Sequence, residues 1–270
     1  MKEGLINKIY ACIIAVSALI LVIAIQTGLL FAFGDIENSP MKKGLFYVAY
    51  SGISIIIFGL MYRFMQNNLN GHFEVREYSG KRMSALTIVI VGFGIQAFGY
   101  GVLNLIYLVA SETELFKAYA EMMDGISGSG TTPLIILYSI ILAPVCEELI
   151  FRGVVMNGFR FGFKDSTANI LAAMMFGIFH GNLIQGIYAF LFGMMLGYVK
   201  LKRNRIGDSI LMHLVINLTG LSIVPIFATF INAFTNPVVA YVTVAVVGLI
   251  ICVMWIAKER VEKEDVLNLE

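Results

Sequence analysis

Two adjacent glutamates interrupt an otherwise apolar stretch of this chain. Residues 134–146 carry almost no polarity, and Glu147, Glu148 and Arg152 follow directly, after which the apolar run resumes. Successive residues of an α-helix point about 100° apart, whereas residues four apart share a face. Glu148 and Arg152 can therefore form an ion pair, while Glu147 turns elsewhere. Glu147 is then the carboxylate that stays able to act as a general base near neutral pH.

Two of the three histidines also lie in apolar segments. His180 follows Phe176 by four residues, and His213 precedes Asn217 by four, so the members of each pair share a helix face. Taken singly, such a histidine is often a packing hydrogen-bond donor, and such an asparagine often joins two helices. Together with Glu147 they supply a base and donors for a developing oxyanion. That set suits hydrolysis of an acyl bond by water.

The elements that position these residues must be membrane helices. Of the 270 residues, 59% are hydrophobic and only 14% are charged, against about 25% charged in soluble domains. This composition excludes an ordinary soluble enzyme, a disordered chain and a nucleic-acid-binding domain, whereas the net charge of +1 says nothing about partners. Continuous apolar runs also argue against an outer-membrane barrel, whose strands alternate. The sequence predicts an all-α polytopic membrane protein with about eight transmembrane helices of roughly 20 residues each.

The predicted spans follow the apolar runs along the chain. They cover residues 9–33, 44–62, 84–110, 132–156, 167–182, 184–199, 206–230 and 237–257. A short amphipathic helix over residues 111–126 is expected to lie on the outer membrane surface. In the sixth span, Gly193 and Gly197 have a GxxxG spacing, which allows close helix approach. We expect these glycines to bring that helix against a neighbour in the core.

Three motifs with four-residue spacing occur in order: Glu147-Glu148-x-x-x-Arg152, Phe176-x-x-x-His180 and His213-x-x-x-Asn217. This combination closely resembles the CAAX-protease and bacteriocin-processing (CPBP, or Abi) family of intramembrane endopeptidases, whose eukaryotic relative is the Ras-converting CAAX endopeptidase. The resemblance covers about residues 131–230. By resemblance, Glu147 would activate the attacking water, and Glu148 and Arg152 would support it. The rest of the site would be His180, His213 and Asn217.

The resemblance also implies a domain organisation. Residues 131–230 would be the catalytic four-helix core. Residues 1–130 would be accessory transmembrane helices with the outer amphipathic segment. Residues 231–270 would be a last transmembrane helix with a charged cytoplasmic tail. The predicted partners are a peptide or membrane-protein substrate and the lipid bilayer, with no nucleic acid.

The predicted function is hydrolysis of a peptide bond of a membrane-associated, lipidated or peptide substrate by a glutamate-activated water. One alternative is a non-catalytic bacteriocin self-immunity or membrane scaffold protein that binds a partner with the same helices. Another is a proton-coupled transporter in which Glu147 relays protons. Such transporters are typically built from inverted repeats, and none is visible in the sequence. The HExxH, GxSxG and GxGD motifs of other intramembrane proteases do not occur.

Metal dependence has two readings. We expect no cofactor. A zinc-bound histidine usually has a partner that orients its second ring nitrogen, and no carboxylate of the fifth to seventh spans is placed to do this for His180 or His213. The alternative is zinc, since Glu147 and the two histidines would suit a site with an open fourth position.

The distribution of Lys and Arg predicts the orientation in the membrane. With the N-terminus in the cytoplasm, 16 of the 19 Lys and Arg residues fall on the inside. Only Lys42, Lys43 and Lys117 fall outside. An even number of spans returns the C-terminus to the cytoplasm. The sequence therefore predicts a multi-pass protein of the plasma membrane with both termini cytoplasmic.

Cysteine labelling tests this topology. In a background without Cys12, Cys146 and Cys252, a single cysteine near Lys202 should be protected from a membrane-impermeant thiol reagent in intact cells. A single cysteine near Lys43 should be labelled under the same conditions. External labelling near Lys202 would overturn the predicted orientation.

Overall fold

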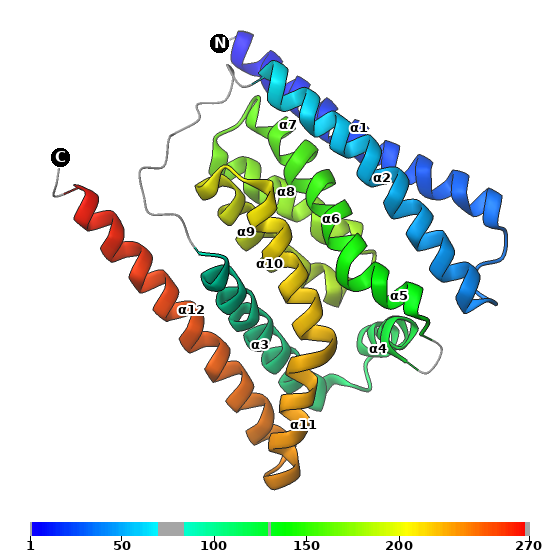
Figure 1. Cartoon of the computed structure of the whole chain (residues 1–270), viewed down its shortest axis with the longest axis vertical. Coiled ribbons are helices and arrows are strands. Elements are labelled where there is room, and N and C mark those ends of the chain that lie inside the picture. Colours follow the sequence, from blue (N-terminus) through cyan, green and yellow to red (C-terminus); the bar gives the residue numbers. More distant parts are fainter. Residues whose placement is uncertain (1, 70–83, 129–130, 268–270) are drawn as a thin grey trace. The chain divides into compact units, whose positions relative to one another are not determined.

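Every regular element in the described part of the chain is a helix, as the sequence predicts (Figure 1). The computed structural model describes residues 2–69, 84–128 and 131–267. His72, Arg76, Lys81 and Arg82, of which the last three enter the topology prediction, lie outside the described residues. The chain forms two compact units. The first joins residues 1–76 with 119–210, and the second joins residues 77–118 with 211–270.

Seven helical stretches among the described residues are long and apolar enough to cross a bilayer. They are Gly4–Phe33, Pro40–Asn67, Ala85–Ala110, Pro133–Arg160, Leu183–Arg203, Ile206–Phe234 and Pro237–Lys258. The fifth predicted span is the exception, because α8 (Asp165–Phe179) has only 15 residues. Its length of about 22 Å is less than the roughly 30 Å of the hydrocarbon core. The protein is a multi-pass membrane protein with one full-length span fewer than predicted.

The first unit is built around the helix that carries the two glutamates. Its elements are α1 (Lys2–Phe33), α2 (Pro40–Leu69), α5 (Pro133–Leu137), η1 (Tyr138–Leu142), α6 (Ala143–Glu148), η2 (Leu149–Val155), α7 (Met156–Arg160), α8 and α9 (Leu183–Arg203). The segments α5 to α7 follow one another without a break and form the fourth predicted span. Helices α1 and α2 lie side by side and pack against this span (Figure 1). The amphipathic helix expected between the third and fourth predicted spans is confirmed as α4 (Glu114–Ser127).

Two π-helical segments, η1 and η2, flank the glutamates within the fourth span. Pro144 stands near the start of α6, directly after η1. A proline has no N–H to donate and its ring clashes with the carbonyl four residues earlier. A wider π turn before it relieves that clash, and single π turns are frequent at functional sites. Glu147 and Glu148 therefore occupy a short α-helical segment between two widened turns.

Helix α2 runs parallel to the fourth span along most of its length. The contacts that define this seam are Gly44 with Leu134, Tyr47 with Tyr138, and Tyr62 with Gly153. The two tyrosine rings of the middle contact are stacked, with centroids 4.5 Å apart. All three pairs have nearly the same separation in sequence, so the two helices keep one register from end to end.

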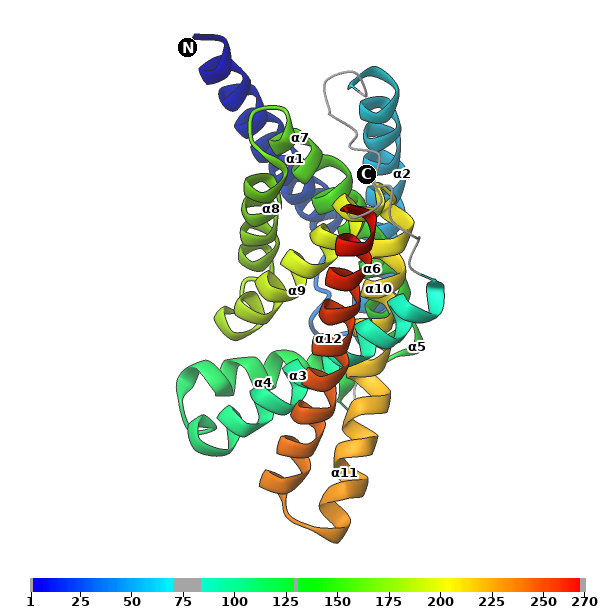
Figure 2. The ribbon, with the colours of Figure 1, turned by 90° about the vertical axis from the view of Figure 1, so that its left-hand side faces the viewer.

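Helices α8 and α9 form an antiparallel hairpin, joined at the lower ends in Figure 2. The link is three residues long, from His180 to Asn182. Gly181 takes a φ of +68°, a left-handed conformation that favours glycine. Asn182 caps α9, because its side chain accepts a hydrogen bond from the Gln185 N–H at 3.1 Å. His180 therefore stands at the tip of the hairpin.

The expected role of Gly193 and Gly197 in close helix approach is confirmed. A Cβ atom on Gly193 would lie 3.1 Å from the Phe176 ring and 3.2 Å from the Ala173 methyl. A Cβ atom on Gly197 would collide with the Asn169 side-chain oxygen. The Asn169 amide donates to the Met194 carbonyl at 2.9 Å. The missing side chains thus let α8 and α9 come close enough for this polar contact.

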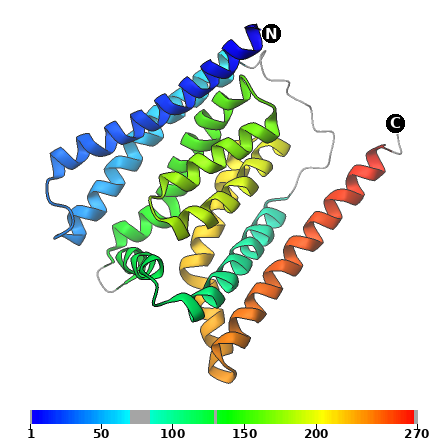
Figure 3. The same ribbon diagram turned by 180° about the vertical axis from the view of Figure 1, so that it is seen from behind.

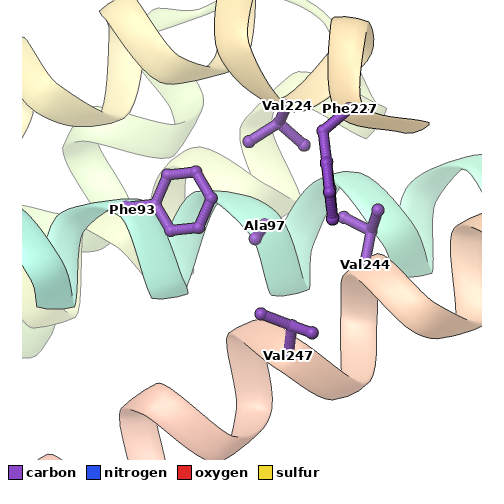
Figure 4. A pocket seen from close by; sticks show the side chains of 6 residues that line it. All are labelled: Phe93, Ala97, Val224, Phe227, Val244 and Val247. Atoms are coloured by element: carbon purple, nitrogen blue, oxygen red, sulfur yellow. The ribbon is translucent and has the colours of Figure 1, made fainter. Parts of the chain in front are cut away.

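The second unit contains α3 (Ala85–Ala110), α12 (Pro237–Leu267) and the segments between Leu211 and Phe234. These segments are most of α10 (Ile206–Leu218), then η3 (Thr219–Ile223) and α11 (Val224–Phe234). Helices α3 and α12 lie side by side, teal and red-orange in Figure 3. A small apolar hollow lies between α3, α11 and α12 (Figure 4). It is lined by Phe93, Ala97, Val224, Phe227, Val244 and Val247. None of these side chains could activate water.

Candidate functional site

The predicted ion pair is present and fully buried. The Arg152 guanidinium donates through Nη1 to Glu148 Oε1 at 2.8 Å. The Arg152 and Glu148 side chains are 1% and 0% exposed. A pair taken out of water must satisfy its remaining polar atoms, because leaving a buried charge without partners is strongly destabilising. The surroundings of Arg152 show how this is done.

Arg152 joins the fourth span to both helices of the hairpin. Its Nη2 donates to the Gly193 carbonyl of α9 at 3.0 Å. Its guanidinium carbon lies 4.5 Å from the centre of the Phe176 ring of α8. A cation over an aromatic face is attracted by the ring electrons. The side chain that neutralises Glu148 is thus also the cross-link that fixes α8 and α9 against the glutamate helix.

His180 is connected to Arg152 through Phe176, whose ring contacts both side chains. The two ring centroids are 4.7 Å apart and the rings are nearly perpendicular. His180 Nδ1 lies 2.7 Å from the Phe176 carbonyl oxygen. A carbonyl can only accept, so Nδ1 carries the hydrogen in this contact, and Nε2 of the neutral ring is the acceptor. A backbone carbonyl thus orients His180. The expectation that no carboxylate would do so was therefore not a sound reason to prefer a metal-free site.

Glu147 differs from Glu148 in its surroundings. It is half-buried, whereas its neighbour is completely enclosed. Its charge interacts with Arg152, and also with the phenol groups of Tyr50 on α2 and Tyr138 on η1. The two adjacent carboxylates therefore lie in different environments, one held in an ion pair and the other partly open.

His213 and Asn217 lie on α10 in the second unit. His213 is buried and Asn217 is half-buried, and their spacing puts them on one helix face. Helix α3 packs closely against α10, because a Cβ atom on Gly92 would lie 3.1 Å from Val215. Four of the six predicted residues are thus gathered in the first unit, and two belong to the second. That the two sets meet stays a prediction.

The zinc alternative also draws on both units. It requires Glu147 and His180 from the first unit and His213 from the second. Among the residues that the structure describes, no three His, Cys, Asp or Glu side chains form a group able to hold a metal ion. The oriented imidazole of His180 has the tautomer that a metal ligand needs. Both readings of metal dependence remain hypotheses.

Lys200 is a buried residue that the sequence analysis counted only among the charges on the cytoplasmic side, without predicting its burial. Its side chain is 1% exposed, and Nζ donates to Asn157 Oδ1 at 2.7 Å. The contact joins the end of α9 to α7. It lies further toward the C-terminal end of α9 than the Gly193 carbonyl that Arg152 binds. Lys200 follows Gly197 by three residues and so continues the glycine face of α9. That periodicity was the signal that could have predicted its burial.

Comparisons with known proteins agree with the motif pattern. Residues 129–219 match the family described as "Type II CAAX prenyl endopeptidase Rce1-like". The chain is 25% identical over 197 residues to the "Putative membrane peptidase YdiL" of Bacillus subtilis (strain 168), which covers 70% of this chain and 78% of that protein. No solved structure matches the chain. The segment 129–219 includes all six predicted site residues.

The different surroundings of the carboxylates predict different effects of substitution. Arg152→Ala should lower the membrane abundance, and should lower the free energy of unfolding by about 3–5 kcal/mol, because it removes the cation that neutralises the buried Glu148. Glu147→Gln should leave both near wild-type values. Quantitative immunoblots and thermal unfolding of the purified variants measure these effects. Equal destabilisation by the two substitutions would contradict the division of roles between the carboxylates.

Proposed function

Since the chain belongs, through residues 129–219, to the Rce1-like family of type II CAAX prenyl endopeptidases, we propose that it is an intramembrane endopeptidase. Its substrate would be a membrane-associated, lipidated or peptide chain. Support comes from the buried Glu148–Arg152 pair, which packs on Phe176 next to His180. Ionisable residues within membrane helices are expensive and usually functional. A half-buried carboxylate directly beside that pair is well suited to act as a base.

In the proposed reaction Glu147 takes a proton from a water molecule, whose oxygen attacks the carbon of the scissile carbonyl. Negative charge then develops on the carbonyl oxygen, where His213 and Asn217 would donate hydrogen bonds. The proton held by Glu147 passes to the amide nitrogen as the carbon–nitrogen bond breaks. The products are one chain ending in a carboxyl group and one beginning with an amine.

The other residues would fix the geometry. Arg152 holds Glu148 and the Gly193 carbonyl at once, so one side chain ties the glutamate helix to the hairpin. Preorganised groups of this kind stabilise a transition state without reorganising during the reaction. His180, with Nε2 as an acceptor, would hold the attacking water beside Glu147.

The organisation of the chain follows from this assignment. We infer that residues 131–230 form the catalytic core, with accessory helices in 1–130 and a last transmembrane helix and cytoplasmic tail in 231–270. The site would open toward the cytoplasm, with both termini on that side. The base and the oxyanion donors already supply what hydrolysis needs, so we propose that no metal takes part. A zinc ion held by Glu147, His180 and His213 would be a Lewis acid in the alternative arrangement.

Comparison of protein N-termini in membranes tests the activity. Cells that produce the wild-type protein should contain new N-termini that are absent from cells producing Glu147→Gln at the same level, because the variant lacks the base. Glu121→Gln, which changes an exposed carboxylate on α4, is the matched control and should give the wild-type pattern. Identical N-termini with wild type and Glu147→Gln would reject the protease and favour the self-immunity or scaffold alternative.

Asn217→Ala and metal analysis test the mechanism once a cleaved substrate is known. Loss of one oxyanion donor typically lowers turnover 10²–10³-fold, so Asn217→Ala should reduce kcat by about that factor while KM stays close to the wild-type value. The purified enzyme should remain active after exhaustive chelation. About one zinc per chain, with activity lost on its removal and restored by its addition, would instead make Glu147, His180 and His213 ligands.

A further inference from the structure

Helix α2 lies outside the segment that matches the family, yet it packs along most of the glutamate helix. The side of α2 that faces this helix carries three hydroxyl groups within about one turn, those of Tyr50, Ser51 and Ser54. The side chains belong to residues that are 3%, 0% and 0% exposed. The spacing of three and four residues puts them on the same face as Tyr47, which stacks on Tyr138. They therefore point into the seam and not toward lipid.

These buried hydroxyls lack ordinary hydrogen-bond partners. Within the described residues, no hydrogen bond of good geometry reaches the hydroxyls of Tyr50, Ser51 or Ser54, although Tyr50 and Ser54 lie within hydrogen-bonding reach of each other. The Cys146 thiol lies beside Tyr50 and Ser54, but a thiol is only a weak donor and acceptor. Buried polar groups are nearly always bonded, and the demand is strongest where no bulk water competes. A cluster of this kind indicates a nearby polar group with which its hydroxyls can form hydrogen bonds.

The position of the cluster identifies that group. Cys146 directly precedes Glu147 in α6. The Glu147 charge interacts with the Tyr50 phenol across the seam. The cluster and the half-buried carboxylate thus share one region of the first unit, at the level between η1 and η2. A phenol is a strong donor to a carboxylate or to a water molecule bound by it.

We propose that Tyr50 is a positioning residue for Glu147. Its hydroxyl, with that of Ser54 beside it, holds the Glu147 carboxylate and the water that this carboxylate activates from the α2 side. Helix α2 is then a wall of the site and not an outer accessory helix. This role rests on the proposed function, but the contact between Tyr50 and Glu147 can be tested without any substrate.

A double-mutant cycle in thermal unfolding tests the contact. The purified full-length protein in lipid nanodiscs is compared with Tyr50→Phe, Glu147→Gln and the double variant. Groups in contact are not additive, so the Tm shift of the double variant should differ from the sum of the single shifts by about 2 °C or more. Tyr62→Phe, on the same helix but against Gly153, is the control and should be additive with Glu147→Gln. Additive shifts for Tyr50→Phe would overturn the proposal.

Kinetics then test the role. Tyr50→Phe should lower kcat about ten-fold, as expected for loss of one hydrogen bond in the transition state, with KM and membrane abundance close to wild type. Tyr62→Phe should leave kcat unchanged. A coupled but fully active Tyr50→Phe variant would reject the positioning role. If Tyr50→Phe does not fold, Ser54→Ala replaces it in both measurements. A wild-type protein that cleaves nothing would reject the proposed function, while the cycle would still decide whether Tyr50 contacts Glu147.

Discussion

Removing two opposite charges from water is the constraint around which the first unit is arranged. Each buried ion costs several kcal/mol unless its partner and its remaining polar atoms are all satisfied. Glu148 satisfies one donor of Arg152, the Gly193 carbonyl satisfies another, and the Phe176 ring faces the guanidinium. A side chain at position 193 would crowd Arg152. The need for glycine there, and hence the close packing of α9, follows from the buried charge.

The backbone also departs from regular α-helix on both sides of the glutamates. Widened turns on both sides of α6 change the directions in which the side chains of the fourth span point. Glu147 and Glu148 can thus meet different neighbours, α2 on one side and the hairpin on another. Helix α2 supplies buried hydroxyls, whereas the hairpin supplies a carbonyl and an aromatic ring. One helix therefore separates a neutralised carboxylate from a partly open one.

The sequence was sufficient wherever the outcome depended on residue type and spacing. Apolar runs predicted the helices, and a four-residue spacing predicted the Glu148–Arg152 pair. Failures occurred where the backbone itself is the partner, because residue type does not reveal which carbonyl an arginine or His180 will meet. The fifth span was counted as a full crossing although α8 has only 15 residues. Its end was placed three residues too late, because the apolar run hides a turn at Gly181 that needs a positive φ. The burial of Lys200 was not predicted, because its charge drew more weight than the helical periodicity around it.

The arrangement of the ion pair within one helix also bears on biosynthesis. The chain emerges in order, and the Gly193 carbonyl is made 41 residues after Arg152. At about 5–20 residues per second, translation leaves an interval of roughly 2–8 s before that partner exists. During this time Glu148, one turn away, is already present to neutralise Arg152. The two charges of this pair can therefore enter the bilayer compensated by each other, before the hairpin is made.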